Sequence, residues 1–455
     1  MRFSSLNFRA LRLVLAALLL CVAVEGQKQK PTRVAEQHYE KGVALLERQQ
    51  LDAAITELAL ATRLNPGSAD AHNALGIALA RKGNVRAATD AFRKAVQLDS
   101  TLYEAQLGLG AALQQSNDVD GAIAAFKRAA SLKPVEAEAR MLLGAALQQK
   151  GNIDAALLEF REAVRLKPDA PEARSYLGYA LGVKGSLREA IAEFEAAVKL
   201  KPDFGEAQYY LGAARWFAGD ASGAIEALSA AARLMPDHTN AHYYLGLALQ
   251  KNGDLRAAAA ELETAVKLSP QLVEARHALG RVLQQDDNTD GAIEAFREVV
   301  RLKPDFVEAH NDLGLALVQK RDPEGAIAEF NAALKLEPGN LVAHHNLGMA
   351  LIQKSDYAAA VAEYRKLLAL APDDAEAHYN LALALKQRDA LDEAVAELKR
   401  AIALQPKTLP EAHYTLGVVL LQQSKLDEAA ASFRAAILAK RDYPEAYYTL
   451  GTVLQ

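Results

Sequence analysis

The chain has 455 residues, a formal net charge of −5 at pH 7 and a composition rich in alanine and leucine. The absence of a basic excess argues against nucleic acid as a partner. Cys21 is the only cysteine, which excludes a disulfide framework. Few stretches have the alternating pattern of strands, so the composition predicts an all-α protein.

Residues 1–26 have the pattern of a secretory signal peptide. Three arginines, Arg2, Arg9 and Arg12, precede an apolar run from Leu13 to Val24 and a small last residue, Gly26. The run is shorter than the roughly 20 residues that span a bilayer comfortably. We therefore predict export to the periplasm or the extracellular space; the alternative is an uncleaved anchor formed by residues 11–24.

A polar lead-in at residues 27–34 is followed by a pattern that returns every 34 residues up to residue 443. In the copy at residues 137–170 its landmarks are Gly144, Ala156, Phe160 and Pro168. Such a period indicates an array of stacked units instead of two or three compact domains. We count twelve copies over residues 35–443, and residues 444–455 form one further helix of the first type without its partner.

Each copy reads as two helices joined by a turn. Apolar residues fall at helical spacing on two segments, with a turn between them that often contains glycine. A residue suited to cap the second helix follows the turn in nine copies. These predicted caps are Asn84, Asp118, Asn152, Ser186, Asp220, Asp254, Asn288, Asp322 and Asp356. A pair this short cannot bury its own apolar face, so neighbouring copies must complete the core.

The order Leu-Gly, then Ala-x3-Phe, then Pro at a period of 34 residues resembles the tetratricopeptide repeat. The resemblance covers residues 35–455 and is specific for fold, but it says little about function. It implies a right-handed superhelical solenoid of about twelve helix-turn-helix repeats plus the lone C-terminal helix. Because this helix keeps Tyr447, Tyr448 and Leu450, we expect it to cover the end of the stack only in part and to favour contacts in a homodimer.

No motif for catalysis, cofactor binding or metal binding stands out. The glycines follow the repeat period, and the carboxylates belong to solvated helix faces and caps. Seven histidines recur at the fourth residue of first helices: His38, His72, His242, His310, His344, His378 and His413. Neighbouring helices stand about 10 Å apart, whereas zinc ligands must all lie about 2 Å from one ion. We therefore predict no metal site, no cofactor and no enzyme activity.

The resemblance places positions two, five, nine, twelve and thirteen of each first helix on an inner groove. Position two is mostly acidic and positions twelve and thirteen are mostly glutamine, but one copy carries Trp216 and Phe217 there instead. Exposed aromatic side chains of this kind are typical of binding surfaces, although several of the tyrosines could instead fill gaps between repeats. The predicted partner-binding residues are Trp216, Phe217, Tyr209, Tyr243, Tyr179, Gln250 and Gln284.

These features favour an exported, non-catalytic scaffold that holds an extended peptide or protein segment in the groove. The acidic charge favours basic or neutral partners. Two alternatives stay open at this point. One is an accessory arm of a glycosyltransferase or cell-envelope enzyme supplied in trans, and the other is an envelope spacer or assembly platform.

Overall fold

The computed structural model describes residues 33–405 and 409–455. The predicted signal peptide, residues 1–26, and residues 27–32 of the predicted lead-in lie outside these ranges. Within them the chain forms 25 α-helices and no strand, which confirms the all-α prediction. The helices fall into two compact units, the first ending at Pro236 and the second beginning at Asp237.

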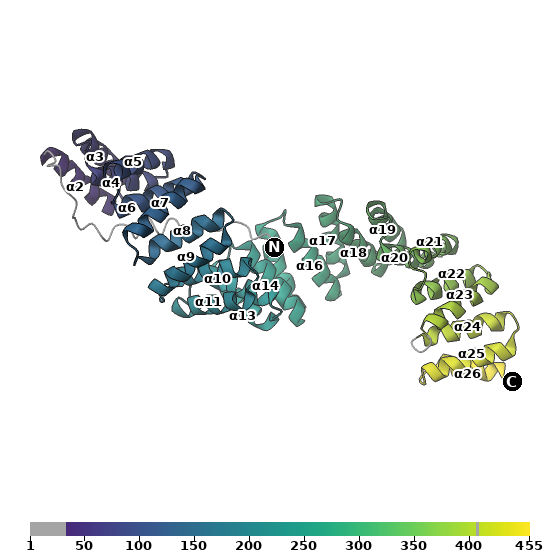
Figure 1. Ribbon diagram of the computed structural model, residues 1–455. Helices are drawn as coiled ribbons and strands as arrows, with labels where there is room; N and C mark the ends of the chain where they lie inside the picture. Colours follow the sequence, from purple (N-terminus) through teal and green to yellow (C-terminus); the bar gives the residue numbers. More distant parts are fainter. Residues whose placement is uncertain (1–32, 406–408) are drawn as a thin grey trace. The chain divides into compact units, whose positions relative to one another are not determined.

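The first unit contains six helix pairs, in which each helix packs against the next (Figure 1). Its helices are α2 (Arg33–Glu47), α3 (Leu51–Leu64), α4 (Ala69–Arg81), α5 (Val85–Leu98), α6 (Tyr103–Gln115), α7 (Val119–Leu132), α8 (Ala137–Gln149), α9 (Ile153–Leu166), α10 (Pro171–Val183), α11 (Leu187–Leu200), α12 (Gly205–Phe217) and α13 (Ala221–Leu234).

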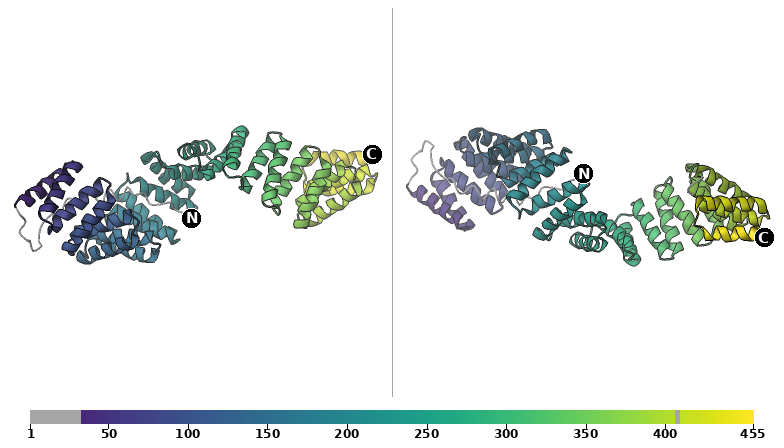
Figure 2. Two further views of the ribbon diagram at one scale, coloured as in Figure 1. Left: turned by 90° about the horizontal axis from the view of Figure 1, so that it is seen from above. Right: turned by 90° about the horizontal axis from the view of Figure 1, so that it is seen from below.

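The second unit contains six further pairs and then α26, again with consecutive helices in contact (Figure 2). Its helices are α14 (Thr239–Asn252), α15 (Leu255–Leu268), α16 (Val273–Gln285), α17 (Thr289–Leu302), α18 (Val307–Gln319), α19 (Pro323–Leu336), α20 (Leu341–Gln353), α21 (Tyr357–Leu370), α22 (Ala375–Gln387), α23 (Leu391–Leu404), α24 (Pro410–Gln422), α25 (Leu426–Ala439) and α26 (Pro444–Val453).

The recurring glycine of the first helix makes room for a large side chain of the second helix. A Cβ atom on Gly144 would lie 2.6 Å from Cε1 of Phe160, closer than van der Waals contact allows. Phe160 is fully buried, as is the recurring alanine, Ala156. The two helices of a pair can therefore approach closely only because the sequence alternates small and large residues across their contact.

All twelve turns between paired helices contain one residue with positive φ. Five of these residues are glycines: Gly83, Gly151, Gly185, Gly219 and Gly253. The other seven are Gln49, Asn117, Asp287, Arg321, Ser355, Asp389 and Ser424. The left-handed conformation is unfavourable for residues that have a Cβ atom, so the backbone of these seven turns is strained.

The predicted caps are confirmed at eight of the nine positions, where an asparagine or aspartate side chain accepts a hydrogen bond from the backbone N–H three residues later. The prediction for Ser186 is wrong, because its side chain makes no such bond. The serine hydroxyl lies one bond nearer the backbone than the carboxylate or amide oxygen of the other eight. Serine can cap a helix in this chain, since Ser68 with ψ 102° accepts a hydrogen bond from the N–H of Ala71 at the start of α4, whereas ψ at Ser186 is only 60°.

Two surface features of the fold bear on the earlier predictions. Among the described helices, none is both long and apolar enough to cross a membrane. On α26, the side chains of Tyr447 and Tyr448 are 53% and 77% exposed. This is the apolar edge expected from the sequence, and its use in contacts between copies of the chain stays a prediction.

Candidate functional site

Aromatic side chains gather between α10, α11 and α12 in the first unit. The ring of Tyr210 stacks on Phe194, with centroids 5.7 Å apart, and meets the edge of Tyr179 at 5.2 Å. Burial raises the pKa of both tyrosines, so their hydroxyls stay protonated well above neutral pH. The cluster thus presents uncharged aromatic groups that can both pack and donate hydrogen bonds.

The four predicted site residues of the first unit differ in their exposure. Phe217 is 39% exposed, and Tyr179 and Trp216 are half-buried. Tyr209 is only 7% exposed, with its ring 5.1 Å from that of Tyr210. Its predicted place on the groove therefore needs correction, because Tyr209 is buried and packs against Tyr210 of the aromatic cluster.

Gly182 opens a small hollow beside these rings. It occupies the twelfth position of α10, where other first helices carry Gln114 or Gln148, and a Cβ atom there would meet nothing closer than 3.9 Å. The resulting space of about 20 Å³ is lined by Tyr179, Phe217 and their neighbours on α11 and α12. The hollow has the size of a single water molecule, so it could accept a methyl group but not a whole side chain.

The remaining predicted residues, Tyr243, Gln250 and Gln284, belong to the second unit and are half-buried. Burial, followed by the proximity of Tyr244 and Glu274, raises the pKa of Tyr243 to about 12. The amide nitrogens of Gln250 and Gln284 donate to Gln285 and Gln319 of the next repeat, over 2.9 and 3.1 Å. The glutamines therefore join neighbouring first helices, a structural role that the sequence prediction did not include.

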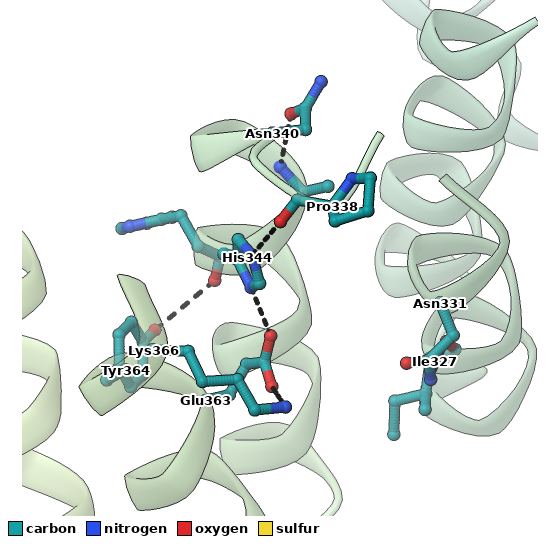
Figure 3. Close-up of polar contacts among 10 residues, drawn as sticks. Ile327, Asn331, Pro338, Asn340, His344, Glu363, Tyr364 and Lys366 are labelled. Atoms are coloured by element: carbon teal, nitrogen blue, oxygen red, sulfur yellow. Dashed lines mark hydrogen bonds and ion pairs between the residues drawn. The ribbon is translucent and has the colours of Figure 1, made fainter. Parts of the chain in front are cut away.

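Most of the recurring histidines contact a glutamate on the second helix of their own repeat, and we call such a contact between the fourth position of a first helix and this glutamate a polar bracket. Nδ1 of His344 contacts the carboxylate of Glu363 on α21, and Nε2 lies 2.9 Å from the carbonyl oxygen of Pro338 in the preceding loop (Figure 3). Lys366 donates to the other oxygen of Glu363 over 2.9 Å. The His344 ring thus ties together the first helix, the second helix and the loop before them.

The same bracket recurs wherever a glutamate stands nineteen residues after the fourth helix position. The pairs are His38–Glu57, Arg140–Glu159, Arg174–Glu193, His242–Glu261, His310–Glu329, His344–Glu363 and His378–Glu397. Copies with Gln106, Gln208 or Arg276 at the fourth position have alanine at the other, as does the copy with His72, and the copy with His413 has serine there. The glutamates at this spacing are visible in the sequence, but His72 and His413 lack such a partner, so a histidine at the fourth position does not by itself predict the bracket.

Five of the recurring histidines are therefore structural partners of single carboxylates: His38, His242, His310, His344 and His378. Within residues 33–405 and 409–455, no group of three or more histidine, cysteine or acidic side chains could hold a metal ion. Each bracket joins one histidine or arginine side chain to one carboxylate in its own repeat, so the arrangement stabilises repeats one by one.

Comparison with known proteins places these observations in a family. The tetratricopeptide repeat profile matches residues 39–102, 107–171, 176–233, 211–273, 277–340, 345–408 and 410–454. Among curated proteins, none matches the chain significantly.

Several solved structures are similar over part or most of the chain. The Cut9–Hcn1 hetero-tetramer of APC/C is 15% identical, with 93% of this chain and 97% of that chain covered and a TM-score of 0.43. YrrB, described as a tetratricopeptide repeat protein with an unusual peptide-binding site, is 26% identical over 40% of this chain and 95% of that chain, with a TM-score of 0.35. MamA from Desulfovibrio magneticus RS-1 is 26% identical over 37% and 95%, also with a TM-score of 0.35.

The family profile matches far more than half of the chain, and the helix pairs have the sequence pattern, the close glycine–aromatic contact and the period of that family. The chain belongs to the tetratricopeptide repeat family, whose members mediate protein–protein interactions.

Proposed function

We propose that this chain is an exported, non-catalytic scaffold that binds an extended peptide or protein segment on the surface around Phe217 and Tyr179. The observation that carries the proposal is the exposure of Phe217, 39%, directly beside the packed rings of Tyr179, Phe194 and Tyr210. A large apolar side chain exposed at such a place gains free energy when a partner covers it.

The surroundings of Phe217 suit it to act as a binding anchor. Its support is rigid, because Tyr210, Phe194 and Tyr179 pack ring to ring beneath this surface. A rigid aromatic group loses little conformational entropy on binding, which is why such groups dominate the affinity of many interfaces. The hollow at Gly182 adds a place where a small apolar group of the partner could insert.

Export is supported by the three arginines and the short apolar run within residues 1–26. If the segment is a cleaved signal peptide, the exported chain begins near Gln27 and is more acidic than the full sequence. Mass spectrometry of the N-terminal peptide of the protein from the periplasmic fraction of an expressing bacterium tests this directly. An intact Met1 in a membrane fraction would favour the anchor instead.

The binding surface is tested with peptides selected from a random display library against the full chain. We expect the selected peptides to bind the Phe217→Ala variant at least tenfold more weakly, with an unchanged melting temperature. Leu158→Ala is the matched control, because Leu158 is 67% exposed on α9 of the same unit, outside the aromatic cluster. Equal affinity for the parent and for Phe217→Ala would contradict the proposal.

A further inference from the structure

Helix α20 in the second unit is unlike the other described helices, because none of its residues is Asp, Glu, Lys or Arg. Its second residue is Val342, where the flanking first helices α18 and α22 have Glu308 and Glu376. Val342 is 61% exposed, and Met349, two turns further along the same face, is 47% exposed. The helix thus presents an apolar face to solvent.

The apolar face continues onto the neighbouring first helices. Helix α20 contacts both α18 and α22. On α18, Leu315 takes the same repeat position as Met349 and is 37% exposed, and on α22 this position is held by the half-buried Leu383. Leu315, Val342 and Met349 thus lie on two first helices that contact each other, and we name these three residues the aliphatic ridge. Single exposed apolar residues need no explanation, but several on adjacent helices indicate a docking surface.

Acidic side chains border the aliphatic ridge. Glu308 and Glu376 are both exposed, and Glu376 lies 3.6 Å from the ring of His345, which stands between Val342 and Met349 on α20. In the first unit the equivalent Glu104 and Glu172 pair with Lys133 and Lys201 at the end of the same repeat.

The repeat that contains Glu308 lacks such a cation. The position of Lys133 and Lys201 is taken there by Glu337, and Glu308 forms no ion pair with any residue in the described part of the chain. The edge of the aliphatic ridge therefore carries negative charge that its own repeat does not neutralise. A partner with positive charge beside its apolar side chains would complement both features.

We propose that the aliphatic ridge is a docking site for a basic amphipathic helix of a partner protein. Neighbouring helices pack about 8–10 Å apart, so ridge residues on successive first helices recur at about that interval. Residues seven apart on a helix lie about 10 Å apart on one face, so a helix laid across α18, α20 and α22 can place one apolar side chain against each of Leu315, Met349 and Leu383, with Val342 beside Met349 on α20. Lysines or arginines along its flank reach Glu308 and Glu376.

The test uses a labelled synthetic helix of three heptads, with leucine on one face and lysine on the flanks, and fluorescence anisotropy with the full chain. Val342→Glu combined with Met349→Ala is expected to weaken binding at least tenfold. The fold tolerates the first change because Glu308 and Glu376 already stand at this position in the flanking repeats. Leu438→Glu on α25 is the control, since Leu438 is 83% exposed in the same unit but lies outside the ridge, and it should change affinity less than twofold.

Two further measurements make the outcome decisive. Glu308→Gln should weaken binding of the lysine helix, and a helix of the same apolar pattern with glutamate flanks should bind at least tenfold more weakly than the lysine helix. Equal binding by the ridge variant and the parent would overturn the proposal. So would equal binding of a scrambled peptide, or no binding of the lysine helix when the parent chain is present in 100-fold excess over it. Phe217→Ala should leave this binding unchanged, so the result is independent of the function proposed above.

Discussion

The two units of the chain use different residues at the left-handed position of the turn between paired helices. In the first unit, four of the six residues with positive φ are glycines, whereas in the second unit Gly253 is the only one among six. The other turns of the second unit place residues such as Arg321 and Ser355 at φ values of 62° and 66°. The left-handed conformation is therefore imposed by the packing of the paired helices, and glycine lowers its cost without being required for it.

The units also differ in their polar brackets and in their surfaces. Three consecutive repeats of the second unit hold His310, His344 and His378 against both a carboxylate and a proline carbonyl. The brackets of the first unit use Arg140, Arg174 and the more exposed His38. In the first unit the exposed Phe217 lies beside an aromatic cluster, whereas α20 of the second unit contributes two exposed residues to the aliphatic ridge. One repeat pattern thus supports two kinds of surface, because the residues that pack are separate from those that face solvent.

The largest expected difference between the units concerns the buried bracket. Glu363→Ala should lower local stability by about 1–3 kcal/mol, because Nδ1 of His344 loses its partner at a site where both side chains are less than 10% exposed. Glu193→Ala in the first unit should cost less than about 1 kcal/mol, since Glu193 and Arg174 are 25% and 21% exposed and water can replace the lost contact.

Hydrogen exchange of the amides in α20 and α21, compared with those in α10 and α11, measures both effects in the full chain. Glu363→Gln is the control, because it keeps an acceptor oxygen for the ring. A cost for Glu193→Ala as large as that for Glu363→Ala would show that burial does not set the strength of the bracket.

At the left-handed position of the turns, glycine can be introduced in the second unit and removed in the first. Arg321→Gly should stabilise the second unit by about 0.5–1 kcal/mol, since glycine removes the left-handed penalty but adds freedom to the unfolded chain. Gly185→Ala should destabilise the first unit by a similar amount, through the backbone alone, because nothing lies within 4 Å of the added Cβ atom. Thermal unfolding followed by calorimetry would detect both shifts, and shifts of the same sign would contradict this account.

The smallest expected effect is at a helix cap. Ala390 precedes α23 with φ −83° and ψ 60°, close to the geometry of the capped turns, but it has no side-chain acceptor. Ala390→Asn should stabilise α23 by about 0.5–1 kcal/mol. Asp254→Ala, which removes the existing cap of α15, should have the opposite effect. Amide exchange in the first turn of each helix measures the change, and protection unaffected by either substitution would count against a role for the caps.

Much of the fold follows from the sequence alone, because its determinants are local and repeat twelve times. The period of 34 residues, the small residues at Gly144 and Ala156 and the asparagine or aspartate caps each act within one helix pair. The glutamate nineteen residues after the fourth helix position is also visible in the sequence, in seven of the twelve copies. Short-range rules of this kind apply before any long-range contact forms.

Tertiary structure decided which side chains face solvent. Tyr209 and Tyr243 occupy the same repeat position, but Tyr209 is buried and Tyr243 only half-buried, because the side chains of adjacent repeats differ. Gln250 and Gln284 bond to the next repeat, and Val342 and Met349 come to lie on a helix next to that of Leu315 only because α18 and α20 pack together. Exposure depends on the neighbours in space, so the repeat position predicts the direction of a side chain but not whether a partner can reach it.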